Sequence, residues 1–194
     1  ELHSDEAIDS DPLPPGQVWA ISPGGSDSAP ALYRIEVTSG PGSGVKILNA
    51  PIPPAFRESV RFGEQNLYTR SRQLVGDRDP RGHEFSVQMR AMDMDRSGNG
   101  LGLPVLIALC GSLIERSVKG GLIIVGALNL GGSVEMIANP VALAELAVDK
   151  KAAGLLMPIS SRKQLFDLPD ELATKINIEF YADAGDALMK AVMD

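Results

Sequence analysis

Short runs of apolar residues near the start of the chain predict a small β-sheet. Residues 17–22 and 31–38 are rich in β-branched and aromatic side chains, and a segment of glycine, serine and proline separates them. The two runs therefore predict a hairpin, with Trp19 and Tyr33 as core or sheet-face aromatic residues. A second glycine-rich turn leads to a short third strand, which we expect over residues 45–48.

Helical spacing then alternates with strand patterns. Residues 55–71 carry apolar side chains at near-helical spacing behind Pro54, and proline is favourable at the start of a helix. Residues 84–92 alternate between apolar and polar positions, which predicts a half-buried strand. Residues 101–115 are apolar on nearly every side and predict a buried helix. The continuous apolar run at 121–130 predicts a strand that is buried on both faces.

The last third of the chain continues this alternation. Residues 140–151 are amphipathic, and Asn139 is the expected N-cap of their helix. We expect strands at 155–158 and 176–181 and a final helix at 184–192. The whole pattern predicts an α+β fold with α/β character, in which a mixed sheet is packed with helices behind the N-terminal hairpin.

Length and composition fit one domain with an N-terminal extension. The chain has 194 residues, of which 44% are hydrophobic, so it can bury a core. Residues 1–16 are acidic and rich in proline, and we expect them to form a flexible linker to a domain at 17–194. Because the chain begins with glutamate, we expect it to be part of a longer protein.

Charge and cysteine content narrow the classes of function. A net charge of −7 disfavours non-specific binding of nucleic acid, because attraction to phosphate requires clustered cations. A charged loop is expected at 73–83, and we interpret the arginines in and beside it as solvated: Arg70, Arg72, Arg78 and Arg81. Cys110 lies in an apolar run and is expected in the core, and a single cysteine is typical of a reducing cytoplasm. His3 and His83 lack the spacing of a metal motif, and no apolar run reaches membrane-spanning length.

The segment that joins the strand at 84–92 to the helix at 101–115 contains the candidate chemistry. A serine such as Ser97 in a strand-to-helix turn is a nucleophile if a base lies within hydrogen-bond reach, although turn formation is its commoner role. Gly98, Gly100 and Gly102 suggest an anion or nucleotide site at the helix N-terminus, or close packing of helix on sheet, which we favour.

Two carboxylates precede this turn. Asp93 and Asp95 lie at the expected end of the strand, where they are candidates for a metal site or for acid–base chemistry. No third ligand is identifiable in the sequence, so we interpret both as solvated strand ends.

Several motifs follow the turn in a recognisable order. The apolar helix is followed by the pattern G-x-x-x-L-x-G-x-V at residues 126–134, an alanine-rich helix at 141–147, and an Asp-Leu-Pro-Asp segment at 167–170. From Gly82 onward this order resembles the proteolytic domain of Lon-type proteases, which cleave peptide bonds with a serine–lysine dyad. The turn at 95–102 stands where that family has D-G-P-S-A-G.

Further stretches extend the resemblance over nearly the whole chain. They are residues 15–18, 32–37, 101–103, 108–110, 130–132, 180–183 and 186–187. In these the chain resembles the C-terminal domain of Lon-related AAA+ proteins from BREX phage-defence systems. The resemblance implies a cytoplasmic ring in which an upstream domain binds ATP and Mg²⁺, while this domain binds no cofactor or metal. It also implies self-association, contact with polypeptides or other defence proteins, DNA engagement through the full-length assembly, and no membrane contact.

The catalytic dyad of the family does not carry over to this sequence. Matching the apolar helix without gaps places Gly98, rather than Ser97, at the position of the nucleophile. Matching residues 126–134 places Val141 at the position of the lysine. Lys150 and Lys151 lie further along the same expected helix, roughly 14 Å from residue 141 at ~1.5 Å per residue. Proton transfer needs about 3 Å, so neither lysine replaces the missing base.

We therefore expect no catalytic residues, with Ser97 as the fallback nucleophile, and a Lon-type domain that serves assembly in phage defence. The alternative is an active ATP-dependent Ser–Lys endopeptidase that uses Ser97 with a lysine placed differently from the match above. A small-anion or nucleotide site at residues 98–102 is a third hypothesis.

Overall fold

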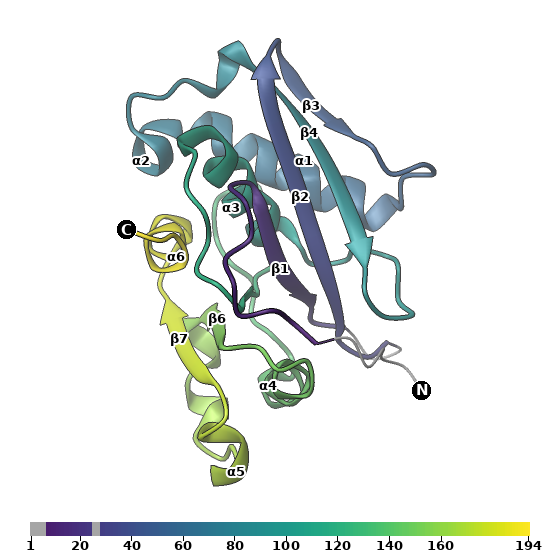
Figure 1. The fold of residues 1–194 in the computed structure, drawn as a ribbon, viewed down its shortest axis with the longest axis vertical. Helices are drawn as coiled ribbons and strands as arrows, with labels where there is room; N and C mark the ends of the chain where they lie inside the picture. Colours follow the sequence, from purple (N-terminus) through teal and green to yellow (C-terminus); the bar gives the residue numbers. More distant parts are fainter. Residues whose placement is uncertain (1–6, 25–27) are drawn as a thin grey trace.

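A computed structural model describes residues 7–24 and 28–194, which form a mixed seven-stranded sheet packed with helices (Figure 1). The strands are β1 (Gln17–Ser22), β2 (Ala31–Pro41), β3 (Gly44–Ile47), β4 (His83–Ala91), β5 (Leu122–Ile124), β6 (Gly154–Pro158) and β7 (Asn177–Tyr181). The helices are α1 (Pro54–Thr69), α2 (Ser71–Val75), α3 (Gly102–Ile114), α4 (Pro140–Asp149), α5 (Asp170–Ala173) and α6 (Ala184–Ala191). This architecture confirms the predicted α+β class.

The sheet is antiparallel from β4 through β2 to β1 and parallel beyond β1, and at its other edge β3 pairs parallel with β4. Its strand order is β3-β4-β2-β1-β5-β6-β7. The predicted hairpin is confirmed, because β1 pairs antiparallel with β2, which in turn pairs antiparallel with β4. On its other side β1 pairs parallel with β5, and the parallel pairing continues through β6 to β7.

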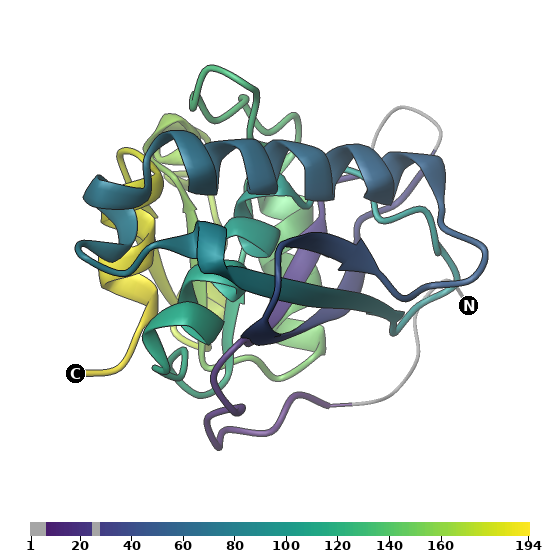
Figure 2. The same ribbon diagram turned by 90° about the horizontal axis from the view of Figure 1, so that it is seen from above.

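Each face of the sheet has its own hydrophobic core. On one face α1, α3 and α6 pack against inward side chains such as Tyr33 and Phe85. Figure 2 shows α1 lying as a long helix over this layer. On the other face α4 covers the parallel half of the sheet, where Ile21 and Leu143 belong to a second cluster. Helix α3 is buried along nearly its whole length, as its continuous apolar sequence predicts.

Two elements differ from the sequence prediction. The strand predicted at 121–130 is wrong in length, because β5 ends at Ile124 and the chain then folds back so that Leu128 bridges Val134. Gly126 leaves the sheet because its carbonyl accepts a hydrogen bond from Leu103 N (3.1 Å) at the start of α3. The predicted loop at 73–83 contains the end of α2 and a 3₁₀ turn at Pro80–Gly82.

The N-terminal segment from residue 7 onward runs along the parallel half of the sheet. Ile8 is buried in the second core, and its amide donates to the carbonyl oxygen of Lys150 at 2.8 Å. Gly120 provides room for this segment, since a Cβ there would lie 2.0 Å from the carbonyl oxygen of Ser10. Residues 1–6 of the predicted linker, including His3, lie outside the described residues.

Candidate functional site

The turn between β4 and α3 is held by two buried hydroxyl groups. Tyr33 on β2 donates its hydroxyl to the carbonyl of Asp95 (2.8 Å) and accepts from Gly98 N (3.2 Å). Ser59 on α1 donates to the carbonyl of Gly98 (3.2 Å) and accepts from Leu101 N (3.2 Å). Burial raises the pKa of Tyr33, so this phenol stays protonated and keeps its role as a donor. The backbone of the turn is therefore fixed from both the sheet and α1.

The hydroxyl of Ser97 takes part in the local structure of the turn. Asp95 Oδ1 accepts from Ser97 N at 2.9 Å, and Ser97 Oγ accepts from Asn99 N at 3.3 Å. Hydrogen bonds of this kind, from a side chain to a backbone amide two residues on, are typical turn-forming interactions. These two hydrogen bonds explain the presence of Asp95 and Ser97 in the turn without a catalytic role for either side chain.

The glycines of the turn are required by packing. Gly98 is buried and has a φ of +68°, and a Cβ there would lie 2.5 Å from Met89 Sδ and 2.8 Å from Phe56 Cβ. Gly102 begins α3 against Leu128, whose backbone nitrogen lies 3.2 Å from the place of a Cβ. A side chain at the position that the sequence match assigned to the nucleophile would thus point into the core.

A small cleft opens beside this turn. It has a volume of about 90 Å³ and lies between α1, the N-terminus of α3 and residues 127–135. Asn99 and Gly100 form part of its wall, and its two ionisable side chains are Glu58 and Glu135. Within the described part of the chain, no lysine, arginine or histidine lines the cleft. Two carboxylates repel a phosphate, so the cleft disfavours the anion or nucleotide hypothesis.

Val141 is placed away from this cleft. It lies in the first turn of α4, half-buried, and packs against the second core on the other side of the sheet. Asn139 accepts from Ala142 N (3.3 Å), which confirms it as the N-cap of this helix. Valine has no group that accepts a proton, so this position supplies no base.

Lys150 is bound within the fold. Its Nζ lies 2.7 Å from Asp93 Oδ1, and both side chains are almost completely buried. Asp93 Oδ2 also accepts from Leu32 N at 2.7 Å. The prediction that Asp93 is a solvated strand end is therefore wrong, because the chain just after β4 brings it to Lys150 at the end of α4, where it binds the buried ammonium group. The same prediction for Asp95 is also wrong. Asp95 is half-buried, and its carboxylate accepts a hydrogen bond from Ser97 N within the turn.

The remaining candidates have structural roles. Arg70 is not fully solvated, since it donates to Asn66 Oδ1 (2.7 Å) and to the carbonyl of Gly131 (2.6 Å); Arg72, Arg78 and Arg81 are exposed as predicted. Cys110 is buried, which confirms its place in the core. The described residues contain no group of three His, Cys, Asp or Glu side chains that could hold a metal ion. Nor does any of the described helices combine the length and apolar character needed to cross a membrane.

Curated relatives support the family suggested by this frame, although no model of a known protein family matches the chain. The chain is 27% identical over 179 residues to "Lon-like protease BrxL" of Escherichia coli O9:H4 (strain HS), a match that covers 92% of the chain. Together with the two matches below, this supports a Lon-type protease domain related to BrxL. It is 28% identical over 92 residues, or 47% of the chain, to the "Lon-like protease BrxL" of Bacillus cereus (strain H3081.97). It is also 25% identical over 181 residues, or 91% of the chain, to the "Lon protease" of Lawsonia intracellularis (strain PHE/MN1-00).

These matches cover 26%, 14% and 21% of the three relatives, so the chain spans at most about a quarter of their length. Sequence reasoning missed Tyr33, Ser59 and the Lys150–Asp93 pair as parts of the Lon-type frame. The sequence signal for these residues was that polar side chains occur within otherwise apolar stretches. This signal did not indicate which of the polar side chains contact one another in the fold.

Proposed function

We propose that this Lon-type domain does not cleave peptide bonds and serves the assembly of a longer ATP-dependent ring protein. One observation supports the loss of activity above all others: the two positions matched to the dyad hold Gly98, where a Cβ would point into the core, and Val141, which packs on the other side of the sheet. A serine–lysine mechanism needs an amine within about 3 Å of the hydroxyl, so that the amine can accept its proton.

The chemistry of Ser97 leads to the same conclusion. A serine hydroxyl is a weak nucleophile unless a neighbouring base activates it. Ser97 Oγ lies at the surface side of the turn and accepts a hydrogen bond from Asn99 N. The buried lysine of the domain, Lys150, has its Nζ on the Asp93 carboxylate. Losing a nucleophile–base pair costs on the order of 10⁶-fold in rate in a serine protease, which leaves no useful turnover.

The relatives provide the rest of the proposal. Two of them bear the name Lon-like protease BrxL, which favours a role in phage defence. In such a longer protein, ATP and Mg²⁺ would bind upstream of this domain, and DNA would be engaged by the full-length assembly in the cytoplasm. The domain itself would contact further copies of the chain, polypeptides or other defence proteins.

A proteolysis assay tests the inactivity. The chain, and the longer protein with ATP and Mg²⁺, are incubated with unfolded casein, and products are followed by gel and mass spectrometry. We expect casein to remain intact in both reactions. Cleavage that disappears in Ser97→Ala would instead establish the active Ser–Lys peptidase. Cleavage that persists in Ser97→Ala would come from a contaminating protease.

A further inference from the structure

Two surface patches at different ends of the domain carry mainly opposite charges: one is a groove beside two arginines, and the other is an exposed aromatic side chain followed by acidic residues. The first, the α1 groove, has a volume of about 430 Å³ and is formed by α1 and the segment after β5. Arg57, Arg61 and Gln65 line it from successive turns of α1, and Leu130 forms its apolar wall. Leu130 is 61% exposed, so its apolar side chain is accessible to a partner at this groove.

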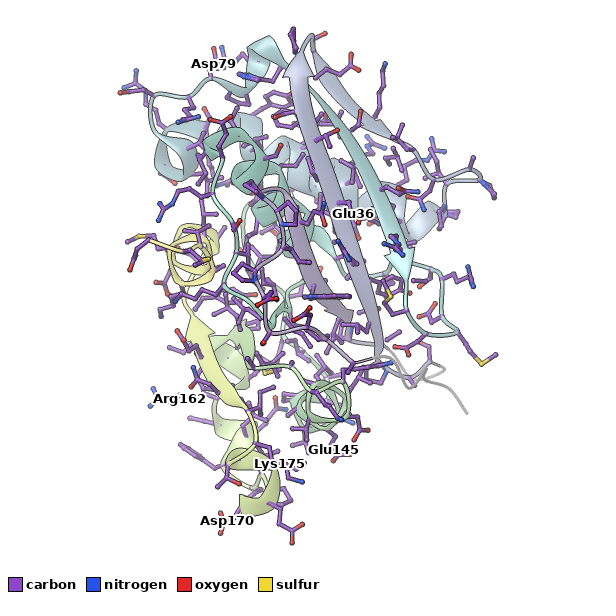
Figure 3. The ribbon with its side chains drawn as sticks, in the orientation of Figure 1. Glu36, Asp79, Glu145, Arg162, Asp170 and Lys175 are labelled. Carbon is purple, nitrogen blue, oxygen red and sulfur yellow. The ribbon has the colours of Figure 1, made fainter. Side chains whose placement is uncertain are left out.

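The second patch, the Phe166 knob, consists of Phe166 with Asp167, Asp170 and Glu171. Phe166 is 76% exposed, and the three acidic residues that follow it are exposed as well. The knob begins where the 3₁₀ turn Lys163–Leu165 ends and continues into α5. Figure 3 shows Asp170 at one extreme of the long axis, whereas Figure 1 places α1 toward the other end of the sheet.

The charges of the two patches are available for an intermolecular contact. Among the described residues, none of the side chains of Arg57, Arg61, Asp167, Asp170 and Glu171 lies within ion-pair distance of an opposite charge. Each patch also has one residue of the charge opposite to its main charge. Glu58 lines the otherwise basic α1 groove, and Arg162 lines the hollow beside Phe166 in the otherwise acidic knob. The groove volume lies in the range of roughly 300–1,000 Å³ that is usual for binding pockets, so it admits an aromatic ring.

We infer that the α1 groove of one copy receives the Phe166 knob of a second copy. The two patches differ and lie on different ends of the chain, so the contact is head-to-tail, and contacts of this kind close into rings or extend into filaments. Phe166 acts as the buried aromatic anchor, and the arginines of the groove select its acidic flank. The inference rests on the proposed assembly function and specifies the surfaces that would carry it.

Charge reversal in two separate variants tests the contact. Arg57→Glu/Arg61→Glu makes the groove acidic, and Asp167→Lys/Asp170→Lys makes the knob basic. Sedimentation velocity of the 194-residue chain over a range of concentrations measures association. We expect the unsubstituted chain to associate less at high salt and each variant to associate roughly tenfold more weakly, because like charges then face each other.

An equimolar mixture of the two variants gives the decisive result. In the mixture, the acidic groove of the first variant meets the basic knob of the second. The unchanged basic groove of the second variant meets the unchanged acidic knob of the first, so copies that alternate regain the full association. Phe166→Ser should also weaken association without lowering the melting temperature. Lys119→Glu and Glu145→Lys, which change exposed charges outside both patches, are the matched controls and should leave association unchanged.

The possible failures are distinguishable. If the chain associates but either reversal has no effect, or the mixture fails to recover, the contact is wrong while the assembly function stands. If the unsubstituted chain stays monomeric at every concentration reached, both the contact and an assembly role of the domain are overturned. The casein assay tests peptidase activity independently of either outcome.

Discussion

Removing one partner of the buried Lys150–Asp93 ion pair should destabilise the domain strongly. The two charges are 2.7 Å apart and their side chains are 2% and 1% exposed. At an effective dielectric constant of ~20, their attraction is about 6 kcal/mol, and the cost of removing both ions from water offsets most of it. Lys150→Met abolishes this attraction but leaves the Asp93 carboxylate buried. The expected loss is therefore about 3–5 kcal/mol.

Urea unfolding measures this loss, with the fluorescence of the single tryptophan, Trp19, as the probe. The set consists of Lys150→Met, Asp93→Asn and the double variant. Because either single change already breaks the pair, the double variant should lose less stability than the sum of the singles, by about 1–3 kcal/mol. Lys151→Met is the matched control, since Lys151 is the exposed neighbour in sequence, and it should lie within ~0.5 kcal/mol of the unsubstituted chain.

Two results would refute this reasoning. One is a loss below about 1 kcal/mol for Lys150→Met, because it would mean that water or another group replaces the ammonium without cost. The other is strict additivity of the two single changes, because residues in direct contact are expected to couple. Either would show that the contact between β4 and the end of α4 contributes little to stability.

Three further predictions concern packing, reactivity and capping. Gly98→Ser should lower the melting temperature by several degrees without creating peptidase activity, because its Cβ would lie 2.5 Å from Met89 Sδ. Gly44→Ser is the control for backbone strain, since Gly44 has a φ of +84° and open space around it. An equal loss of stability in both variants would contradict the packing argument. Cys110 should resist a thiol reagent at pH 8 until urea unfolds the chain, since burial raises its pKa to about 12 and thiolate is the reactive form; rapid labelling of the folded chain would disprove this. Asp183→Ala should cost ~1 kcal/mol in urea unfolding, because Asp183 Oδ1 accepts from Asp186 N at the start of α6, and Asp183→Asn should retain most of the stability; equal losses would argue against a capping role.

Elements with a strong local signal could be predicted from the sequence. The hairpin of β1 and β2 follows from two alternating runs around a turn-rich segment, and the long apolar run of α3 has the length and position of a buried helix. The start of α4 was predictable because Asn139 and Pro140 are favourable at an N-terminus. Each of these signals lies within a few neighbouring residues.

Features that depend on distant residues could not be predicted. The third strand, β3, pairs parallel with β4, although the short turn before it suggests a partner in β2. The run 121–130 looks like one strand, but β5 ends early because Gly126 is recruited to the start of α3. Lys150 and Asp93 are 57 residues apart, and nothing local distinguishes this buried lysine from the exposed Lys151 beside it.

The glycine motifs of the Lon-type frame follow from its packing. A Cβ at Gly126, the first residue of the pattern G-x-x-x-L-x-G-x-V, would lie 2.2 Å from the hydroxyl of Tyr181, which donates to the carbonyl of Val125 at 2.6 Å. These contacts require glycine whether or not a serine and a lysine are present. The side chain of Val141, by contrast, is half-buried at the edge of the second core, where a valine packs without a polar partner. The fold can therefore keep its glycines while the position of the base changes, so these motifs indicate the fold and not its activity.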